Sequence, residues 1–201
     1  PMLKQDLHIH TVFSAGDSAV VAEQTLELIS KVNHARIIGI SDHFESITSE
    51  YFETYKKAVT SYGFKVGTEV DGLRSVSEAA SLNFDYYFYH CRDEDKEYTG
   101  IQKLLMTGKP VIIAHPYAFN TNLDKIPNEC YIEINNRYIW RFDWKSYLSD
   151  YINDFRFILS SDAHQPNWLN QNVASYVADE LGIRETLIFD HEPVTLELAT
   201  H

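Results

Sequence analysis

The six residues Asp6-Leu7-His8-Ile9-His10-Thr11 alternate polar and apolar side chains near the start of the chain. This pattern predicts that residues 3–10 form a strand on which His8 and His10 point to the same side. Two imidazoles on one strand face can share a single metal ion. An isolated pair of this kind is more often two partly exposed histidines on an edge strand, so the rest of the chain decides between the two interpretations.

The chain has 201 residues, of which 44% are hydrophobic, and its formal net charge is −12. This length and apolar content suit one globular domain, which we expect to span residues 2–201. Pro1 precedes Met2 and resembles the remnant of an expression tag. Long nucleic acids are disfavoured as partners because they need clustered Lys and Arg, and the only local basic pair is Lys56-Lys57.

The two cysteines, Cys91 and Cys130, form no CxxC motif and no disulfide framework, which is typical of a reducing cytoplasm. No stretch approaches the length of a membrane span, and the N-terminus lacks the apolar core of a signal peptide. We therefore expect a cytoplasmic protein that has no membrane partner. The oligomeric state stays open, because a Tyr-rich face does not by itself indicate an interface.

Short apolar runs alternate with amphipathic segments along the chain. The predicted strands are 3–10, 36–41, 64–70, 84–89, 110–114, 130–134 and 155–160, with one more short strand at 186–189. The predicted helices are 20–33, 50–62, 75–82, 96–106, 140–152 and 170–181, with Asp17 or Ser18 as the N-cap of the first. This alternation predicts right-handed βαβ units and a parallel sheet.

Two parallel architectures fit this order of elements. A doubly wound open sheet would need a Gly-rich phosphate-binding turn after its first strand, and Gly16 stands alone there. About seven βα units with few residues to spare instead favour an α/β fold of the closed or nearly closed barrel type. We therefore expect a barrel.

Side chains that bind metals recur where the predicted strands end: His8 and His10, then His43, Glu69, His90, His115, Asp162 and His164. In a β/α barrel the carboxyl ends of the strands meet at one face, which holds the active site. The sixth strand has no obvious ligand at its end, although Glu133 and Asn135 are nearby. Six histidines buried together without metal would repel one another as imidazolium or leave ring nitrogens unpaired, so the sequence predicts a metal site.

The motifs DLHIHT (6–11), SDH (41–43), GTEVD (67–71), AHP (114–116) and SSDAH (160–164) together resemble the PHP (polymerase and histidinol phosphatase) family. The resemblance runs from Asp6 to His164 and implies a distorted (β/α)7 barrel with two or three Zn, Mn or Fe ions. It implies that one ion is held by His8, His10, Glu69 and Asp162. It also implies a second ion held by the bridging Glu69 with His90 and His115, and a third held by His43, His164 and a loop residue.

The chain departs from the family pattern at that loop residue. Family members have a His or Asp there, whereas the matching positions here are Ala15 and Gly16. Asp17 lies next to them and would reach the ion if the loop shifted by one residue. Its competing role is that of a helix N-cap, so the third ion depends on which role Asp17 takes.

Zinc, manganese or iron suits a site of neutral imidazoles with few carboxylates, whereas calcium and magnesium prefer more oxygen ligands. Two divalent ions with Glu69 and Asp162 leave two surplus positive charges, and a third ion with Asp17 adds one more. Such a site attracts an anion, which favours a small phosphorylated substrate. Metal coordination would lower the pKa of a bound water to about 7 and so supply a hydroxide as the nucleophile.

We therefore expect a hydrolase of phosphoric ester bonds, similar to a histidinol phosphatase in its reaction on a phosphate monoester. Glu69 would bridge the ions, and Asp162 or His164 would protonate the leaving oxygen. Arg92 and Arg137 are candidates to clamp the phosphate by bidentate contacts, with a role as plain surface arginines as the alternative for each. Asp6 is expected to accept a hydrogen bond from His8 or His10 and orient it.

Three alternatives stay open. One is phosphodiester cleavage, as by a 3′-5′ exonuclease, on nucleotides or short oligonucleotides. Another is amide or ester hydrolysis, which metal-bridged hydroxide in β/α barrels also serves. The third is a binding or regulatory domain with structural metals. Closed structural zinc sites favour Cys-rich shells, and neither cysteine falls among the expected ligands, which weakens this last alternative.

Overall fold

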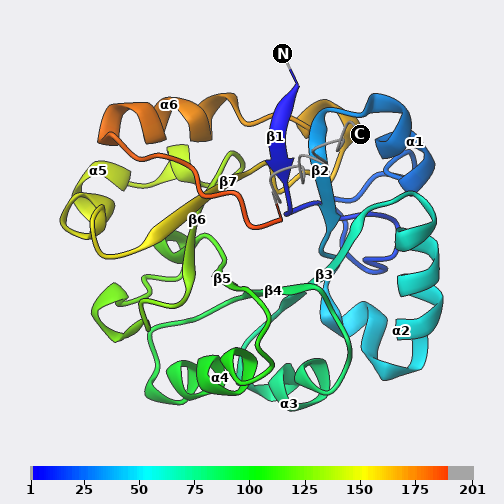
Figure 1. Cartoon of the computed structure of the whole chain (residues 1–201), viewed down its shortest axis with the longest axis horizontal. Helices are drawn as coiled ribbons and strands as arrows, with labels where there is room; N and C mark the ends of the chain where they lie inside the picture. Colours follow the sequence, from blue (N-terminus) through cyan, green and yellow to red (C-terminus); the bar gives the residue numbers. More distant parts are fainter. Residues whose placement is uncertain (1, 190–201) are drawn as a thin grey trace, which may run out of the picture.

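Seven parallel strands form one sheet, and their order in the sheet follows their order in the chain. The computed structural model describes residues 2–189. The strands are β1 (Leu3–Asp6), β2 (Ala35–Ile40), β3 (Lys65–Val70), β4 (Tyr86–Tyr89), β5 (Val111–Ile113), β6 (Tyr131–Asn135) and β7 (Arg156–Ser160). The helices are α1 (Leu26–Val32), α2 (Phe44–Ser61), α3 (Val76–Ala80), α4 (Asp95–Leu105), α5 (Trp144–Leu148) and α6 (Asn172–Leu181). They lie around the outside of the strands (Figure 1).

The first and last strands approach each other just beyond their ends. A parallel bridge joins Ile9 to Ala163, and the His10 amide donates to the Ala163 carbonyl at 2.9 Å. The sheet therefore forms a nearly closed barrel, and the predicted parallel α/β barrel is confirmed. The same contact brings the first histidine motif beside the last one.

Alternate residues of the strands contribute to two separate apolar clusters. The smaller cluster consists of Leu7, Tyr86, Phe88, Ile112, Ala114 and Ile158. Their neighbours Tyr87, Tyr89, Val111, Ile113, Phe157 and Leu159 belong to the larger cluster, which also contains the buried faces of the helices. Because strand side chains alternate between faces, the smaller cluster fills the barrel and the larger one joins the barrel to its helices.

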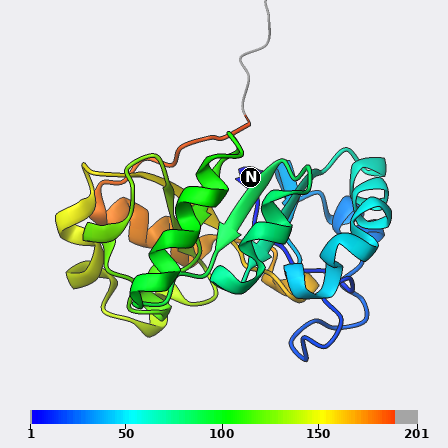
Figure 2. The same ribbon diagram turned by 90° about the horizontal axis from the view of Figure 1, so that it is seen from below.

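The segment after β1 differs from the prediction. Helix α1 begins at Leu26 rather than Val20, and Thr25 is its N-cap, with an oxygen that accepts from the Leu28 amide. The predicted cap at Asp17 or Ser18 is therefore wrong. The residues before Thr25 form turns, and this segment, in blue, projects at one end of the barrel (Figure 2). The described C-terminal segment, in red, lies at the opposite end.

Other boundaries also differ. Strand β1 ends at Asp6, so the two histidines of the first motif follow the strand rather than lie within it. Helix α2 begins at Phe44, and Thr48 interrupts it with a positive φ of 49°. The predicted helix at 140–152 is a short α5 between two 3-10 turns. Residues 186–189 form no strand, because the chain makes one bridge there, between Phe157 and Glu185, and its next backbone groups bind the side chain of Gln5.

None of the helices within residues 2–189 has the length and apolar content needed to cross a membrane.

Candidate metal centre

The carboxyl ends of the strands bring all the predicted metal ligands together. Three groups have ligand atoms within 4.8 Å of one another: His8, His10 and Asp162; Glu69, His90 and His115; and His10, Asp17, His43 and His164. Each strand end places its polar side chain on the same face of the barrel, as the fold predicts. His34 lies outside these groups, and His191 and His201 lie outside the described residues.

Glu69 occupies the centre of this arrangement, at the end of β3. Five histidines have a ring nitrogen within 3.6 Å of its carboxylate oxygens: His8, His10, His43, His90 and His115. Its Oε2 faces His8 Nε2 at 2.7 Å and His90 Nε2 at 3.0 Å, while its Oε1 faces His43 Nδ1 at 3.2 Å. A carboxylate whose two oxygens face different sets of imidazoles is placed to bridge metal ions.

The first motif and the β7 end meet around His10. The Nε2 atoms of His8 and His10 are 3.2 Å apart, and Asp162 Oδ1 lies 3.3 Å from the first and 3.4 Å from the second. All three side chains are almost completely buried. Three ligand atoms therefore converge on one point, with the Glu69 carboxylate beside them.

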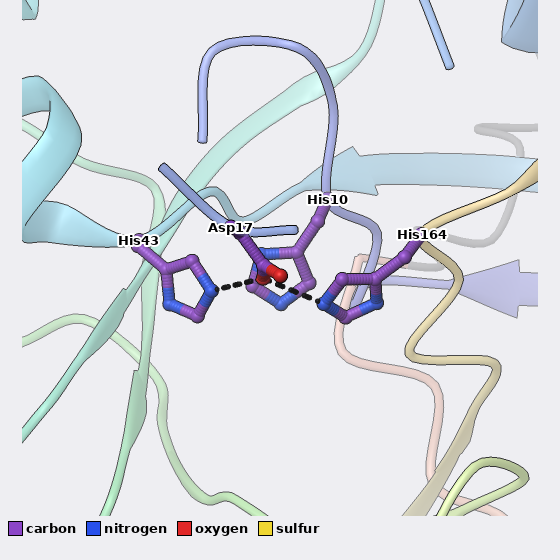
Figure 3. Close-up of side chains that lie close together, drawn as sticks. All are labelled: His10, Asp17, His43 and His164. Atoms are coloured by element: carbon purple, nitrogen blue, oxygen red, sulfur yellow. Dashed lines mark hydrogen bonds and ion pairs between the residues drawn. The ribbon is translucent and has the colours of Figure 1, made fainter. Parts of the chain in front are cut away.

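Asp17 joins this centre rather than capping a helix. Its Oδ2 atom lies 2.8 Å from His43 Nε2 and 3.1 Å from His164 Nε2, with His10 behind it (Figure 3). Its Oδ1 atom accepts from the Ala19 amide, which closes a turn within the loop. Asp17, rather than Ala15 or Gly16, is therefore the loop residue that reaches His10, His43 and His164.

Asp42 holds this loop in place, a role that the sequence reasoning missed. Its carboxylate accepts hydrogen bonds from the Thr11 amide at 2.6 Å, the Thr11 hydroxyl at 2.7 Å and the Ser14 hydroxyl at 2.6 Å. Ser14 in turn accepts from the His43 amide at 3.1 Å. The sequence signal for this role was the position of Asp42 next to His43 in the SDH motif. The structure shows that the Asp42 carboxylate is fully buried.

The sixth strand supplies supporting residues rather than ligands. Glu133 Oε2 lies 2.5 Å from His8 Nδ1 and also accepts from the Ser160 hydroxyl, while its Oε1 accepts from the His115 amide at 2.8 Å. Asn135 donates to Asp162 Oδ2 at 3.0 Å. Both residues therefore orient ligands from outside the centre.

Asp6 does not orient His8 or His10, contrary to expectation. Its carboxylate is bound instead to His34 Nε2 at 2.8 Å and to the Ser161 amide at 3.1 Å. Because β1 ends at Asp6, this side chain points toward the β7 end and away from the first motif. It ties two segments of the barrel together, while the orienting role for His8 passes to Glu133.

The two predicted phosphate-clamp arginines lie in different surroundings. Arg92 Nη2 forms a 2.7 Å ion pair with Asp71 Oδ1, and Asp71 in turn contacts His90 Nδ1 at 3.0 Å. Arg137 lies closer to the ligands, with Nη1 3.0 Å from His164 Nε2. Arg137 thus borders the Asp17 group directly, whereas Arg92 supports the residue that orients His90.

The charges of the centre shift the pKa values of the histidines in opposite directions. Burial disfavours the imidazolium of His43, but the hydrogen bond and charge of Glu69, with those of Asp17, outweigh it and raise the pKa to about 10. Burial also disfavours the imidazolium of His90, but the charges and hydrogen bonds of Glu69 and Asp71 outweigh burial and raise the pKa of His90 to about 9. At His10 burial prevails and lowers the pKa to about 3.

The two central carboxylates stay ionised. Burial raises the pKa of Glu69, but the charges of His90, His8 and His10 outweigh burial and hold it well below its usual range. Burial also raises the pKa of Asp162, but the charge of His8 outweighs burial and lowers this pKa below its usual range. Without a metal, protons on some of the histidines would balance these negative charges, so metal ions and protons compete for the same atoms.

Two of the candidate ligands have a positive φ that non-glycine residues rarely adopt. The values are 24° at His115 and 53° at Asp162. Each such backbone costs of order 1–3 kcal/mol and persists only where the surroundings impose it. Two of the five non-glycine residues with a positive φ within residues 2–189 are therefore candidate ligands of the centre.

The polar atoms of the centre fit a metal. Glu69 Oε2, His90 Nε2 and Asp162 Oδ1 are buried and have no hydrogen-bond partner of adequate geometry. Buried polar atoms without partners are costly, and a divalent ion would satisfy them. A donor set of imidazole nitrogens with a few carboxylate oxygens suits Zn, Mn or Fe.

The comparisons with known proteins bear on the fold. No protein-family model matches the chain, and no curated protein matches it. Among solved structures, the chain is similar to a truncated form of 3-deoxy-D-arabino-heptulosonate 7-phosphate synthase from Thermotoga maritima, with a TM-score of 0.51 and 14% sequence identity. The match covers 90% of this chain and 72% of the other. At this identity the likeness supports the barrel fold alone.

Proposed function

We propose that this protein is a metal-dependent phosphoesterase of the PHP type, which hydrolyses a small phosphate monoester and binds two or three divalent Zn, Mn or Fe ions. The observation that carries the proposal is the Glu69 carboxylate, whose oxygens face five histidine ring nitrogens within 3.6 Å. A buried carboxylate between two sets of imidazoles suits a bridged metal pair better than a closed structural site.

The residues of the centre have different roles in the proposed reaction. Bound divalent ions supply an activated hydroxide and offset the charge of the phosphate. Arg137, with Nη1 3.0 Å from His164 Nε2, is placed to hold a phosphate oxygen at the edge of the centre. Asp162 and His164 are the candidates to give a proton to the leaving oxygen; because both pKa values lie below their usual range, either group would first take that proton from the attacking water. Glu133 and Asp71 fix the rings of His8 and His90.

Charge favours a phosphate ester over a neutral amide or ester as the substrate. The centre has five carboxylates in contact with its histidines and two arginines at its border; the carboxylates are Asp17, Glu69, Asp71, Glu133 and Asp162. Divalent ions would turn this balance positive, which attracts an anion. Cys91 and Cys130 are buried elsewhere and belong to none of the three ligand groups.

The test combines metal content with turnover. Wild-type protein should contain two or three equivalents of Zn, Mn or Fe by plasma mass spectrometry and hydrolyse 4-nitrophenyl phosphate. Glu69→Gln should lower turnover about 100-fold or more, because the bridging carboxylate is lost. The exposed Glu129→Gln is the control and should match wild type.

Three outcomes distinguish the alternatives. Faster cleavage of bis(4-nitrophenyl) phosphate than of the monoester would favour a phosphodiesterase. Tightly bound metal without turnover of either, together with unfolding on chelation, would favour a structural role. A metal content below one equivalent after reconstitution would rule out the multinuclear centre.

A further inference from the structure

A pocket of about 260 Å³ lies beside the candidate metal centre, where β6 and β7 end. Its lining includes Ser161, the neighbour of Asp162, and Arg137, whose Nη1 is 3.0 Å from His164 Nε2. A substrate whose phosphate occupies the centre would therefore have the rest of its structure next to this pocket.

The lining carries positive charge and no carboxylate. It consists of Asn136, Arg137, Trp140, Arg141, Ser161, Trp168 and Asn170. Two guanidinium groups on one pocket are a local exception in a chain with a net charge of −12. The pocket therefore favours an anionic group.

The two asparagines are already engaged with the protein. Asn136 Nδ2 donates to Asn170 Oδ1 at 3.1 Å, and Asn136 Oδ1 accepts from the amides of Val173 and Ala174 at the start of α6. These contacts use the asparagine groups to hold α6. Recognition of a ligand in the pocket is thus left mainly to the guanidinium groups.

Aromatic rings hold both guanidinium groups by their faces. Arg137 Cζ lies 5.0 Å from the ring centre of Tyr138 and 5.5 Å from that of Trp168. Arg141 Cζ lies 5.0 Å from Tyr138 and 5.0 Å from Trp140. Stacking occupies the faces and leaves the N–H edges for bidentate contacts with an anion. Because both arginines contact Tyr138, their Cζ atoms are separated by at most twice 5.0 Å.

Part of this donor set has no partner in the protein. Arg137 Nε is buried and unpaired. The Arg141 side chain forms neither a hydrogen bond nor an ion pair with any of residues 2–189, although it is stacked between two rings. The unpaired Arg137 N–H is costly because it is buried, whereas Arg141 is exposed and its N–H groups are accessible to an anionic ligand.

We propose that the pocket binds a second acidic group of the substrate, a carboxylate or a second phosphate, through Arg141, while Arg137 spans the pocket and the metal centre. This inference rests on the proposed phosphoesterase function and names its substrate class. The substrate is a small phosphate monoester whose leaving group carries another acid a few bonds from the ester oxygen.

Non-hydrolysable phosphonates test this inference by binding alone. We would titrate metal-loaded protein by calorimetry with propylphosphonate, 3-phosphonopropionate and propane-1,3-diphosphonate. The two probes with a second acid should bind about tenfold more tightly or better than propylphosphonate, as a charged hydrogen bond predicts. Comparison of the carboxylate and the diphosphonate identifies the preferred acid.

Two arginine variants make the test specific. Arg141→Met should remove the advantage of the second acid and leave propylphosphonate binding unchanged. Arg156→Met is the matched control, because Arg156 also stacks on an aromatic ring, that of Tyr131 at 4.2 Å, but at the start of β7 on the opposite end of the barrel. It should bind all three probes like wild type.

The outcomes separate this inference from the proposed function. Equal binding of the three probes, no binding of any, or equal loss for all of them in Arg141→Met would overturn the second acid site. Hydrolysis of 4-nitrophenyl phosphate with such a result would leave the phosphoesterase standing. An Arg141-dependent preference without hydrolysis would support the acid site and reject the phosphoesterase.

Discussion

The Nδ1 atom of His8 lies 2.5 Å from Oε2 of Glu133, and both side chains are fully buried. The other ring nitrogen of His8 faces Glu69 at 2.7 Å. A carboxylate that accepts from Nδ1 keeps the proton on that atom and leaves Nε2 free to bind a metal. Glu133 is held in turn by the Ser160 hydroxyl and the His115 amide, so the ring of His8 has one available orientation.

Replacement of Glu133 should weaken metal binding without removing any ligand. In Glu133→Gln the new amide would donate to His8 Nδ1 and move the ring proton to Nε2, where it blocks the metal. We expect an affinity about 10- to 100-fold lower for one ion, measured by competition with a zinc chelator. The exposed Glu129→Gln is the control, and an unchanged affinity in Glu133→Gln would show that Glu133 does not orient His8.

Asp17 should decide the occupancy of the third ion. It contacts His43 and His164 at 2.8 and 3.1 Å, and its replacement by Asn removes the negative charge from this group while the groups around Glu69 stay intact. We expect Asp17→Asn to lower the metal content by one equivalent, as measured by plasma mass spectrometry.

The exposed Asp154→Asn is the matched control and should keep the wild-type metal content. A loss of all ions in Asp17→Asn would mean that Asp17 supports the whole centre. A wild-type content of two that Asp17→Asn leaves unchanged would mean that Asp17 pairs with the two histidines without an ion.

Gly67 should be intolerant of any side chain because Tyr86 fills the barrel beside it. A Cβ at Gly67 would lie 2.3 Å from Tyr86 Cζ, and one at Gly39 would lie 2.3 Å from the Tyr86 hydroxyl. We expect Gly67→Ala to lower the free energy of unfolding by about 1–3 kcal/mol, as measured by urea denaturation.

A double-mutant cycle supplies the control. Gly67→Ala should cost much less in a Tyr86→Leu background, where the ring that it meets is absent. Equal costs in the two backgrounds would mean that contact with Tyr86 is not the reason for the glycine.

Most strand ends and their polar residues could be predicted from the sequence because short apolar runs and the barrel rule are local and general, although β1 ends four residues before the predicted boundary. The loop before α1 could not, because Asp17, Ser18 and Thr25 are all good N-cap residues by type. Thr25 is the N-cap of α1 because Asp17 instead contacts His43 and His164, which lie far along the chain.

The roles of the supporting carboxylates could not be predicted either, because these roles depend on contacts with residues far along the chain. Asp42, Asp71 and Glu133 follow or end apolar runs just as the ligands do, and sequence spacing does not separate a ligand from the residue that orients it. Only the contacts of Glu133 with His8 and of Asp71 with His90 make the distinction. Asp6 was assigned such a role, but it reaches His34 instead.

Removal of the metal should make stability depend more steeply on pH. The pKa of His43 is about 10 and that of His90 about 9 in the folded protein, against about 6.5 for histidine in an unfolded chain. Between these limits the metal-free folded state binds more protons than the unfolded state. The stability that these two groups contribute should therefore be fully present below about pH 6.5 and be lost as the pH rises through about 9 and 10.

The metal-loaded protein should show little of this fall over the same range, because the gain in metal affinity offsets it. Metal ions displace the protons from His43 and His90, so their binding strengthens as the pH rises, and binding to the folded state adds to stability. Urea unfolding at about pH 6.5, 8 and 9.5, with excess zinc or with chelator, measures both slopes. His43→Gln should flatten the upper part of the metal-free curve. Parallel curves with and without zinc would mean that these histidines do not bind the ions, because an ion that displaces their protons removes the proton uptake that gives the metal-free curve its slope.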